Sequence, residues 1–481
     1  MKNLKADVAV IGAGTAGMVA YSSAKKNTDK VVLIEGGQYG TTCARIGCMP
    51  SKLLIAAAEA SHSIEEAPGF GIYTNGGKTI DGVKVMERVR SERDRFVGFV
   101  LDKVESIPGE YNIRGRARFL DGNTLQVDDH TTVEAKSIVI ATGSSPSVLP
   151  MFQGLGDRLI VNDDIFYWND LPESAVVFGA GIIGLELGQA LHRLGVRTII
   201  LSKDGLVGPL NHPEIKKYAA KTFAEEFYVD TDALVYSVEK NGNKISVKFR
   251  DLEGGDRTES FDYLLAATGR VPNVKNLGLE NTGLELDGRG VPLYDRFTLQ
   301  CGESSVFIAG DADNHLPLLH EASDEGHIAG ENAAAFPDIR AGRRTTPLTI
   351  VFTEPQIAIT GQGYNELKER ENLCFVTGKV SFENQGRSRV MLKNRGLLHI
   401  YAEYGSGLFL GAEMFGPRAE HIGHLLAWSL ENKMTICDML DMPFYHPVIE
   451  EGVRTALRDA NEKLNMGPGL SQDSIECGPG I

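Results

Sequence analysis

At residues 7–17 the chain reads DVAVIGAGTAG, an apolar run expected to form a strand, Asp7 to Ile11, followed at once by a glycine-rich turn. A second expected strand, Lys30 to Ile34, ends at an acid, Glu35. In such a unit the glycines permit a tight turn and close approach of the main chain, the following helix N-terminus faces a pyrophosphate, and the acid binds ribose hydroxyls. The stretch predicts a dinucleotide-binding unit whose cofactor residues are Gly12, Gly14, Gly17 and Glu35.

The same pattern returns later in the chain. An apolar run, Ala175 to Phe178, leads into GAGIIG at residues 179–184, with glycines at the same relative positions. Each unit is later closed by an apolar strand ending in Ala-Thr-Gly, first at Ser137 to Gly143 and then at Tyr263 to Gly269, where small residues let the main chain pass close to a cofactor. Two units predict two bound dinucleotides, and the residues expected to contact them are Thr142, Gly143, Gly179, Gly181, Ile183, Gly184 and Gly269.

Beyond the second unit the pattern changes. Val306 to Ala309 predicts another buried strand with Gly310-Asp311 at its end, so the first domain is expected to resume after an insertion. From about Thr346 a third domain is expected, with strands at Gly396 to Glu403 and Leu408 to Met414 and helices at Ala419 to Glu431 and Glu450 to Lys463. The fold class is therefore α/β, with two Rossmann-like dinucleotide-binding domains and a C-terminal α+β domain. The expected ranges are 1–150 and 276–345 for the first domain, 151–275 for the second, 346–465 for the third and 466–481 for a flexible tail.

Composition narrows the partners. A net charge of −15 argues against nucleic acid or anionic lipid, because both need a basic surface. No run reaches the roughly 18 apolar residues of a membrane span. The apolar stretch Val8 to Ala20 also resembles a signal-peptide core, but its glycines fit a phosphate-binding turn better and no convincing cleavage site follows. We expect a cytoplasmic protein, or one in an organelle.

Six cysteines in 481 residues are too few for a secreted disulfide scaffold. Cys301, Cys374 and Cys437 are isolated, so we expect them to be buried as small apolar side chains. Cys477 lies alone near the C-terminus.

Cys43 and Cys48 differ from the others because they lie five positions apart in GTTCARIGCMPSK, residues 40–52. Such thiols can close a small disulfide ring at the start of a helix, and Pro50 suits a first helical turn. A helix N-terminus, with Arg45 and Lys52 nearby, favours reactive thiolates. The alternatives are a merely stabilising disulfide, two inert thiols, or a zinc site. No second Cys/His pair lies at ligand spacing, so we expect no metal.

The segment 40–52 resembles the pyridine nucleotide-disulfide oxidoreductase flavoproteins, closest in type to dihydrolipoamide dehydrogenase. The resemblance covers nearly the whole chain and extends to Thr268 to Asn273, Gly310-Asp311, Phe352 to Pro355 and His446-Pro447. It implies a homodimer that binds FAD and either NAD or NADP and moves two electrons between the nicotinamide and a thiol or disulfide.

The resemblance also implies roles for individual residues. Cys43 would be the interchange thiol that meets the substrate, and Cys48 the thiol stacked on the flavin. Lys52 would sit near the reactive end of the flavin and pair with Glu186, although a plain surface salt bridge is the alternative. Glu35 would hold the FAD ribose, Asp311 the ribityl or phosphate region, and Arg270 would line the nicotinamide site. The remaining FAD contacts implied are Thr42, Lys52, Ala117, Thr142, Gly143 and Leu319.

His446 is followed five positions later by Glu451. A histidine needs a carboxylate to fix its tautomer and raise its basicity before it can accept a thiol proton near neutral pH. The resemblance implies that this pair reaches the thiols of the partner subunit, so that the active site is shared. The alternative is a hydrogen-bonded histidine in a packed interface. For His421 and His424 we expect interface or surface packing.

The choice of nicotinamide cofactor depends on the second unit. Where an NAD site normally has an acid, this chain has Ser202, followed by Lys203. Lys203, with Arg197 across the strand, would suit the 2′-phosphate of NADP. The alternative is that Lys203 is simply solvated and another residue between Asp204 and Pro209 selects the cofactor.

The leading functional hypothesis is dithiol oxidation of the dihydrolipoamide kind, on a small thiol or a lipoyl-bearing protein. Reduction of a disulfide by NAD(P)H, as in glutathione or mercuric reductases, is the runner-up. The motifs depart from the usual pattern at residues 44–46, 444–445 and 448, which implies a bulkier and more aromatic approach to the thiols. A redox-dependent binding module would need neither the thiol pair nor the His446-Glu451 pair, and a transhydrogenase or quinone reductase would lack the thiols. Cys477 is single, whereas the redox-active tails of related enzymes use adjacent pairs.

Overall fold

The computed structural model describes residues 2–74 and 76–464. Its first sheet is built on parallel pairing of β1 (Lys2–Ile11), β2 (Val31–Glu35) and β6 (Thr131–Ile140), with β3 (Asn112–Arg114) beyond β2. β4 (Ala117–Phe119) and β5 (Thr124–Val127) extend it as an antiparallel hairpin beside β6. β17 (Val306–Ile308) then pairs in parallel with the end of β6. The chain therefore returns to its first sheet after building the second, and β1 begins five residues before the predicted Asp7.

The helices on this sheet pack very closely. α1 (Thr15–Ala24) follows the first glycine turn and lies against α8 (Leu319–Ala335). A Cβ atom on Gly326 would lie 2.3 Å from the Ala16 carbonyl oxygen, and one on Gly330 equally close to that of Ala20. Small residues on facing turns thus bring α8 and the Gly310-Asp311 turn next to the first helix.

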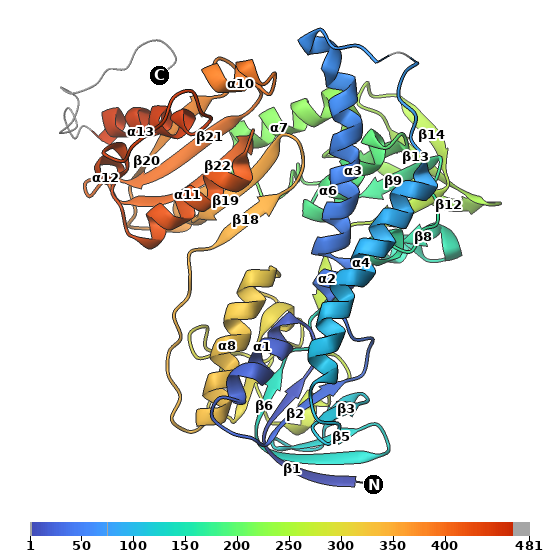
Figure 1. The fold of residues 1–481 in the computed structure, drawn as a ribbon, viewed down its shortest axis with the longest axis vertical. Helices are drawn as coiled ribbons and strands as arrows, with labels where there is room; N and C mark the ends of the chain where they lie inside the picture. The colour runs from blue at the N-terminus through green and yellow to red at the C-terminus, as the bar shows by residue number, and fades with distance from the viewer. Residues whose placement is uncertain (1, 75, 465–481) are drawn as a thin grey trace.

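Two long helices connect the first domain to the second, as Figure 1 shows. α3 (Cys48–Glu66) packs against α4 (Gly82–Glu105) and against α6 (Ile182–Arg193) of the second domain. The expectation that one helix start holds both thiols was wrong in part, since Cys43 lies in a separate short helix, α2 (Thr42–Ile46). Gly47 joins the two helices, and a Cβ there would lie 2.9 Å from the Thr42 carbonyl oxygen.

The second domain repeats the parallel arrangement. Its sheet runs in the order β11-β10-β9-β15-β8, formed by Tyr228–Asp230, Arg197–Leu201, Ser174–Phe178, Tyr263–Ala266 and Leu159–Ile160. An antiparallel meander, β12 (Val235–Asn241), β13 (Lys244–Arg250) and β14 (Asp256–Phe261), packs beside it. α5 (Asn162–Ile165) follows β8, and α7 (Pro213–Glu226) lies before β11. A small ribbon of β7 (Ser144–Pro146) and β16 (Arg270–Pro272) joins the ends of the two dinucleotide domains.

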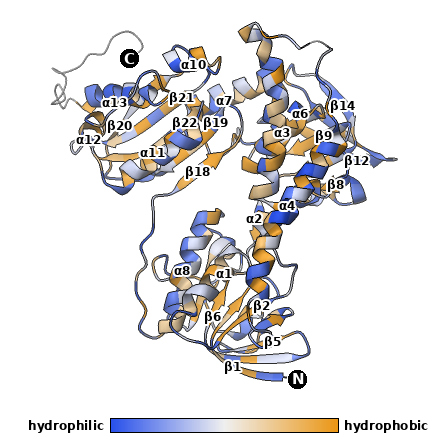
Figure 2. Cartoon of the chain, viewed as in Figure 1, coloured by the Kyte–Doolittle hydropathy of each residue, from blue (hydrophilic) through white to orange (hydrophobic). Residues whose placement is uncertain are grey.

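The third domain is an antiparallel sheet in the order β18-β19-β22-β21-β20, with α11 (Ala419–Glu431) packed on β19 and α13 (Glu451–Leu464) on β20. The predicted helix 419–431 is confirmed, and the other predicted elements shift by one or two residues. The strands are Leu348–Val351, Gln356–Gly361, Phe409–Gly416, Leu397–Glu403 and Phe375–Ser381 in sheet order, and the short helices are α9 (Tyr364–Glu369), α10 (Gly386–Val390) and α12 (Ile436–Leu440). Figure 2 shows apolar residues concentrated in the strands of the two parallel sheets and of the third-domain sheet, whereas β12 and β14 of the meander are largely hydrophilic.

Burial of the isolated cysteines was predicted correctly only for Cys301. Cys374 is exposed because it precedes β20, the edge strand of the third sheet, and Cys437 is half-buried on α12. Cys477 lies outside the described residues. Within the described part of the chain, no helix combines the length and the apolar character needed to cross a membrane.

Candidate active site

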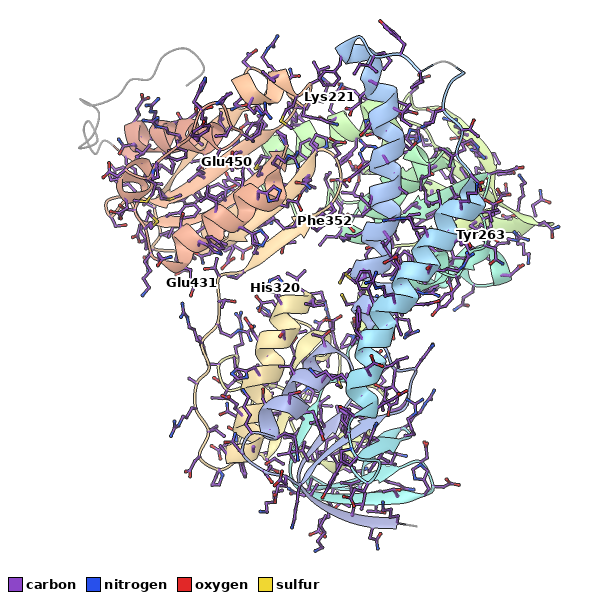
Figure 3. The ribbon with its side chains drawn as sticks, in the orientation of Figure 1. Lys221, Tyr263, His320, Phe352, Glu431 and Glu450 are labelled. Atoms are coloured by element: carbon purple, nitrogen blue, oxygen red, sulfur yellow. The ribbon has the colours of Figure 1, made fainter. Side chains whose placement is uncertain are left out.

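A cavity of about 1200 Å³ lies where the carboxyl ends of the two parallel sheets face each other. The starts of α1, α3 and α6 border it, and Phe352 and His320 lie on opposite sides of the same central space (Figure 3). Many of the predicted site residues line it together: Gly14, Thr42, Cys43, Cys48, Lys52, Gly143, Gly179, Gly181, Ile183, Glu186, Ser202, Lys203, Gly269, Arg270, Asp311 and Leu319.

The first glycine turn fits the pyrophosphate of FAD. Gly14 caps α1 without a side-chain hydrogen bond, and a Cβ added to it would meet no other described atom within 4 Å. The first-turn N–H groups of α1 therefore face open space, as anion binding at a helix N-terminus requires. Glu35 stands behind the turn, where its Oε2 accepts the Ala13 N–H at 2.7 Å.

Gly12 and Gly17 do not line the cavity but make the turn possible. A Cβ on Gly17 would lie 1.8 Å from the Gly12 carbonyl oxygen. Gly184 has the same relation to Gly179 in the second unit, at 1.9 Å, while Gly181, like Gly14, faces open space. The second turn thus fits the pyrophosphate of a nicotinamide dinucleotide in the same way.

Asp311, Ser144 and Arg270 form a polar chain between the two cofactor regions. The Ser144 hydroxyl donates to Asp311 Oδ2 at 2.6 Å and accepts from Arg270 Nε at 2.7 Å. Arg270 also donates to the Ser144 carbonyl oxygen at 2.7 Å. Arg270 was expected to line the nicotinamide site, and its contacts place it against the FAD-side residues as well. Sequence reasoning missed Ser144, which carries no motif of its own.

The thiols of Cys43 and Cys48 face the cavity from adjacent helices. A hydrogen bond from Cys43, together with the positive charge of Lys52, lowers the pKa of Cys48 to about 7 against the opposing effect of burial. The pKa of Cys43 is raised, because its thiol donates that bond and is partly buried. Of the two thiols, Cys48 is therefore the one that ionises more readily, and Cys43 is the proton donor beside it.

Lys52 reaches across to the second domain. Its Nζ lies 2.8 Å from Glu186 Oε2, and Glu186 is buried at 4% exposure, so this is not a surface salt bridge. The other carboxylate oxygen accepts the Phe352 N–H at 2.9 Å, and the Phe352 ring lies 4.7 Å from the Lys52 ammonium. Phe352, unrecognised as a site residue in the sequence, thus ties the third domain to the lysine beside the thiols.

His446 and Glu451 form the expected pair in the third domain. The imidazole Nδ1 lies 2.9 Å from Glu451 Oε1, and the other carboxylate oxygen accepts the Val448 N–H at 3.1 Å. Neither residue lines the cavity, and α13 lies well apart from α2 in Figure 1. Within one chain the structure does not bring this pair to the thiols.

The residues expected to select the nicotinamide cofactor do not all lie together. Ser202 and Lys203 line the cavity after β10, and Asp204 and Leu206 from the following loop join them. Arg197 was wrongly expected to help them, because it starts β10 and Ser202 follows the strand's other end. Its guanidinium is held by Glu259 at 2.5 Å and lies over the Phe261 ring.

A few predicted contacts lie off the cavity surface. Ala117 is buried in the hairpin strand β4, paired with Val127, and Thr142 lies beside the lining residues Ala141 and Gly143 with its hydroxyl buried and without a hydrogen-bond partner among the described residues. A bound dinucleotide is one source of a partner for that hydroxyl. The roles of both residues toward FAD stay predictions.

The fold and this site define a nucleotide-dependent thiol or disulfide oxidoreductase. Family comparison agrees: the chain belongs to the pyridine nucleotide-disulphide oxidoreductases, whose sequence model matches residues 6–326, with the family's dimerisation domain at 348–457. The chain is thus an FAD-dependent oxidoreductase linked to a pyridine nucleotide, and it acts on dithiols or disulfides.

The proteins similar to this chain include dihydrolipoyl dehydrogenases and a mercuric reductase. The dihydrolipoyl dehydrogenase of Bacillus subtilis (strain 168) is 30% identical, with 93% of this chain and 95% of that protein aligned. That of Geobacillus stearothermophilus is 31% identical over 93% and 94%. A mercuric reductase of Staphylococcus aureus is 27% identical over 94% and 81%. Among solved structures, LpdA from Mycobacterium tuberculosis superposes with a TM-score of 0.78 over 95% of this chain and 99% of that one, at 24% identity, which shows the fold.

Proposed function

We propose that this protein oxidises a dithiol of the dihydrolipoamide type with NAD⁺ or NADP⁺, through Cys43 and Cys48. The observation that carries the proposal is the meeting, in one cavity, of a thiolate-stabilising thiol pair with both dinucleotide turns. FAD, when bound along the first turn, would relay two electrons between the thiols and the nicotinamide.

Residues of the chain itself carry out the thiol–disulfide exchange. In the oxidised enzyme a substrate thiolate attacks Cys43 of a Cys43-Cys48 disulfide, and Cys48 leaves as a thiolate. Lys52, whose charge lowers the Cys48 thiol pKa, stabilises that leaving group. The second substrate thiol then attacks the substrate sulfur of the mixed disulfide, which closes the substrate disulfide and releases Cys43. Cys43 takes up a proton on release, because the pKa of its thiol is raised.

A base must take the substrate proton, and His446 is the candidate. Glu451 fixes Nδ1 as the protonated nitrogen, which leaves Nε2 free to accept. Because the pair lies away from the thiols of its own chain, we propose that it serves the partner's thiols in a homodimer formed through the dimerisation domain.

Substrate and place in the cell are further proposals. The approach suits a small dithiol or a lipoyl group on a partner protein, with no role for nucleic acid or membrane, and we place the enzyme in the cytoplasm. Reduction of a disulfide by NAD(P)H is the alternative direction.

Steady-state assays test the proposal. Purified enzyme is offered dihydrolipoamide with NAD⁺ or NADP⁺, and glutathione disulfide or a panel of small disulfides with NAD(P)H. We expect the highest specificity constant for dihydrolipoamide. Cys43→Ser should abolish it, while Cys374→Ser, at an exposed and isolated cysteine, should leave it unchanged. The proposed function is refuted if the enzyme turns over none of these thiols and disulfides but still transfers electrons from NAD(P)H to a dye.

A further inference from the structure

We propose that His212, Glu214 and His399 form a binding site for a divalent transition metal between the NAD(P)-binding domain and the dimerisation domain. One possible ligand atom from each residue lies within 4.8 Å of the others. His212 and Glu214 stand at the start of α7, whereas His399 comes from β21. The proposal is independent of the redox chemistry at Cys43 and Cys48.

His399 is the observation that points to a ligand. Its side chain is 1% exposed, and neither ring nitrogen has a hydrogen-bond partner among the described residues. Its Nε2 lies 3.6 Å from Glu214 Oε2, and its ring meets that of His212 edge-on at 4.2 Å between centroids. Burying polar atoms without partners costs free energy, so such atoms call for an explanation. A metal bound by His399 would provide one.

Residues around the three candidate ligands hold His212 in position. Glu413, opposite His399 on β22, accepts the N–H groups of Asn211 and His212 at 2.8 and 2.9 Å. Its other oxygen accepts from Tyr364 and Tyr401, so Glu413 is fully used and holds the His212 main chain in place. His212 Nδ1 accepts only a long bond, 3.2 Å, from the Glu214 N–H. Ligation at that nitrogen would exchange a weak hydrogen bond for a metal bond.

The ammonium group of Lys379 already contacts the Glu214 carboxylate. Lys379, across from His399 on β20, places its Nζ 2.5 Å from Glu214 Oε2. The Lys379 side chain is 42% exposed and can leave for solvent, so it is a competitor for the metal rather than a fixed partner. Two imidazoles and one carboxylate suit Zn²⁺, Co²⁺, Ni²⁺ or Cu²⁺ and suit Mg²⁺ or Ca²⁺ poorly.

A second cluster serves as the matched control. His62, Glu66 and Glu354 are equally close together, but Lys393 lies 2.6 Å from Glu66 and also pairs with Glu354, and Arg193 lies 3.0 Å from Glu354. Its carboxylates are thus held by cations that are 24% exposed or less, and its histidine bonds to Glu65 at 3.2 Å. We propose no metal there.

Metal binding to the full-length, FAD-loaded dimer tests the proposal, in a Cys43→Ser/Cys48→Ser background that removes the active-site thiol pair as ligands. After treatment with EDTA, the protein is titrated with CoCl₂ by visible absorption and with ZnCl₂ by equilibrium dialysis. We expect one ion per chain. His212→Asn, which keeps a helix-capping side chain, and Glu214→Gln, at an exposed position, should each weaken binding at least about tenfold.

Further variants sharpen the result. Lys379→Met should strengthen binding because it removes the competing ammonium, and His62→Gln should leave it unchanged. The proposal is overturned if the dimer that lacks Cys43 and Cys48 binds no stoichiometric Co²⁺ or Zn²⁺, or if binding persists unchanged in both His212→Asn and Glu214→Gln. Loss of binding in His62→Gln alone would move the site to the control cluster and equally overturn it.

Discussion

The Nδ1 of His446 lies 2.9 Å from the carboxylate of Glu451, and the histidine is 61% exposed while the glutamate is buried at 8%. A buried acid thus holds the ring of an exposed base, with Nε2 directed away from the acid. Such a pair is built to accept a proton from something outside its own chain's core.

His446→Gln should therefore lower thiol-dependent turnover by about 10²- to 10⁴-fold, the range typical of a lost general base. Electron transfer from NAD(P)H to an artificial acceptor should be spared, because that half-reaction needs no thiol base. Steady-state kinetics of both activities check this, with His421→Gln, another exposed histidine of the same domain, as the control. Equal loss of both activities would show that His446 is structural.

Mixed dimers test whether the site is shared. A dimer of one Cys48→Ser chain and one His446→Gln chain has one intact site if the histidine serves the partner's thiols, and should keep about half of the wild-type turnover. If each site lies within one chain, both sites of the mixed dimer are defective and turnover disappears.

The Cys48 thiolate predicts a pH-dependent colour. A pKa of about 7 means that Cys48 is increasingly ionised as pH rises through neutrality. In Cys43→Ser, where Cys48 cannot form the disulfide and the serine hydroxyl still donates, the flavin-bound protein should show a long-wavelength charge-transfer band with a midpoint near pH 7. Lys52→Met should move the midpoint to higher pH. A Cys43→Ser protein without the band at pH 9 would contradict the assigned thiol roles.

Cofactor preference follows from the residues after β10. Ser202 cannot repel a 2′-phosphate as a carboxylate does, and Lys203 beside it can bind one, so the enzyme should use NADP(H) well. Specificity constants for both cofactors should shift toward NAD(H) in Ser202→Glu. Arg197→Ala should leave the ratio unchanged, because that guanidinium is held by Glu259. A wild type strongly selective for NAD(H), with a ratio unaltered in Ser202→Glu, would show that another loop residue, such as Asp204, reads the ribose.

Glu325 predicts how stability varies with pH. Burial, and next the charge of Asp313, raises the pKa of this carboxyl from 4.5 to about 7, while its Oε2 accepts the Gly310 N–H beside Asp311. The folded state thus holds a proton that the unfolded chain loses near pH 4.5, so the stability it confers is lost as pH rises through about 7. Between pH 5 and 8 the melting temperature of the wild type should fall relative to that of Glu325→Gln. Glu331→Gln, on the same helix but half-exposed, should follow the wild type; identical slopes in all three would refute the prediction.

Much of the fold could be predicted because its signals are local. Gly17 must be glycine because it packs on the Gly12 carbonyl oxygen five residues away, and the second unit repeats this with Gly184. The predicted bounds of helix 419–431 agree with the structure at both ends. The domain boundaries near residues 150, 275 and 345 stay predictions.

What could not be predicted depends on contacts between distant segments. The Phe352 N–H meets Glu186, and His399 lies against the start of α7, only because the third domain docks on the second. Arg197 was expected to be free to bind a phosphate, but it pairs with Glu259 on β14. Cys374 was expected to be buried, but it precedes β20, which is an edge strand. Contacts of this kind produce no periodic pattern in the sequence.

The central claim is that Cys43 and Cys48 exchange electrons with a dithiol substrate. Trypsin cleaves after Arg45, between the two cysteines, so a disulfide between them appears as two linked peptides in a mass spectrum. The oxidised enzyme should give the linked pair, and dihydrolipoamide alone should convert it to two separately alkylated peptides, with Cys374 alkylated in both samples. Free alkylation of Cys43 and Cys48 before any reductant is added, or a link that survives dihydrolipoamide, would contradict the account.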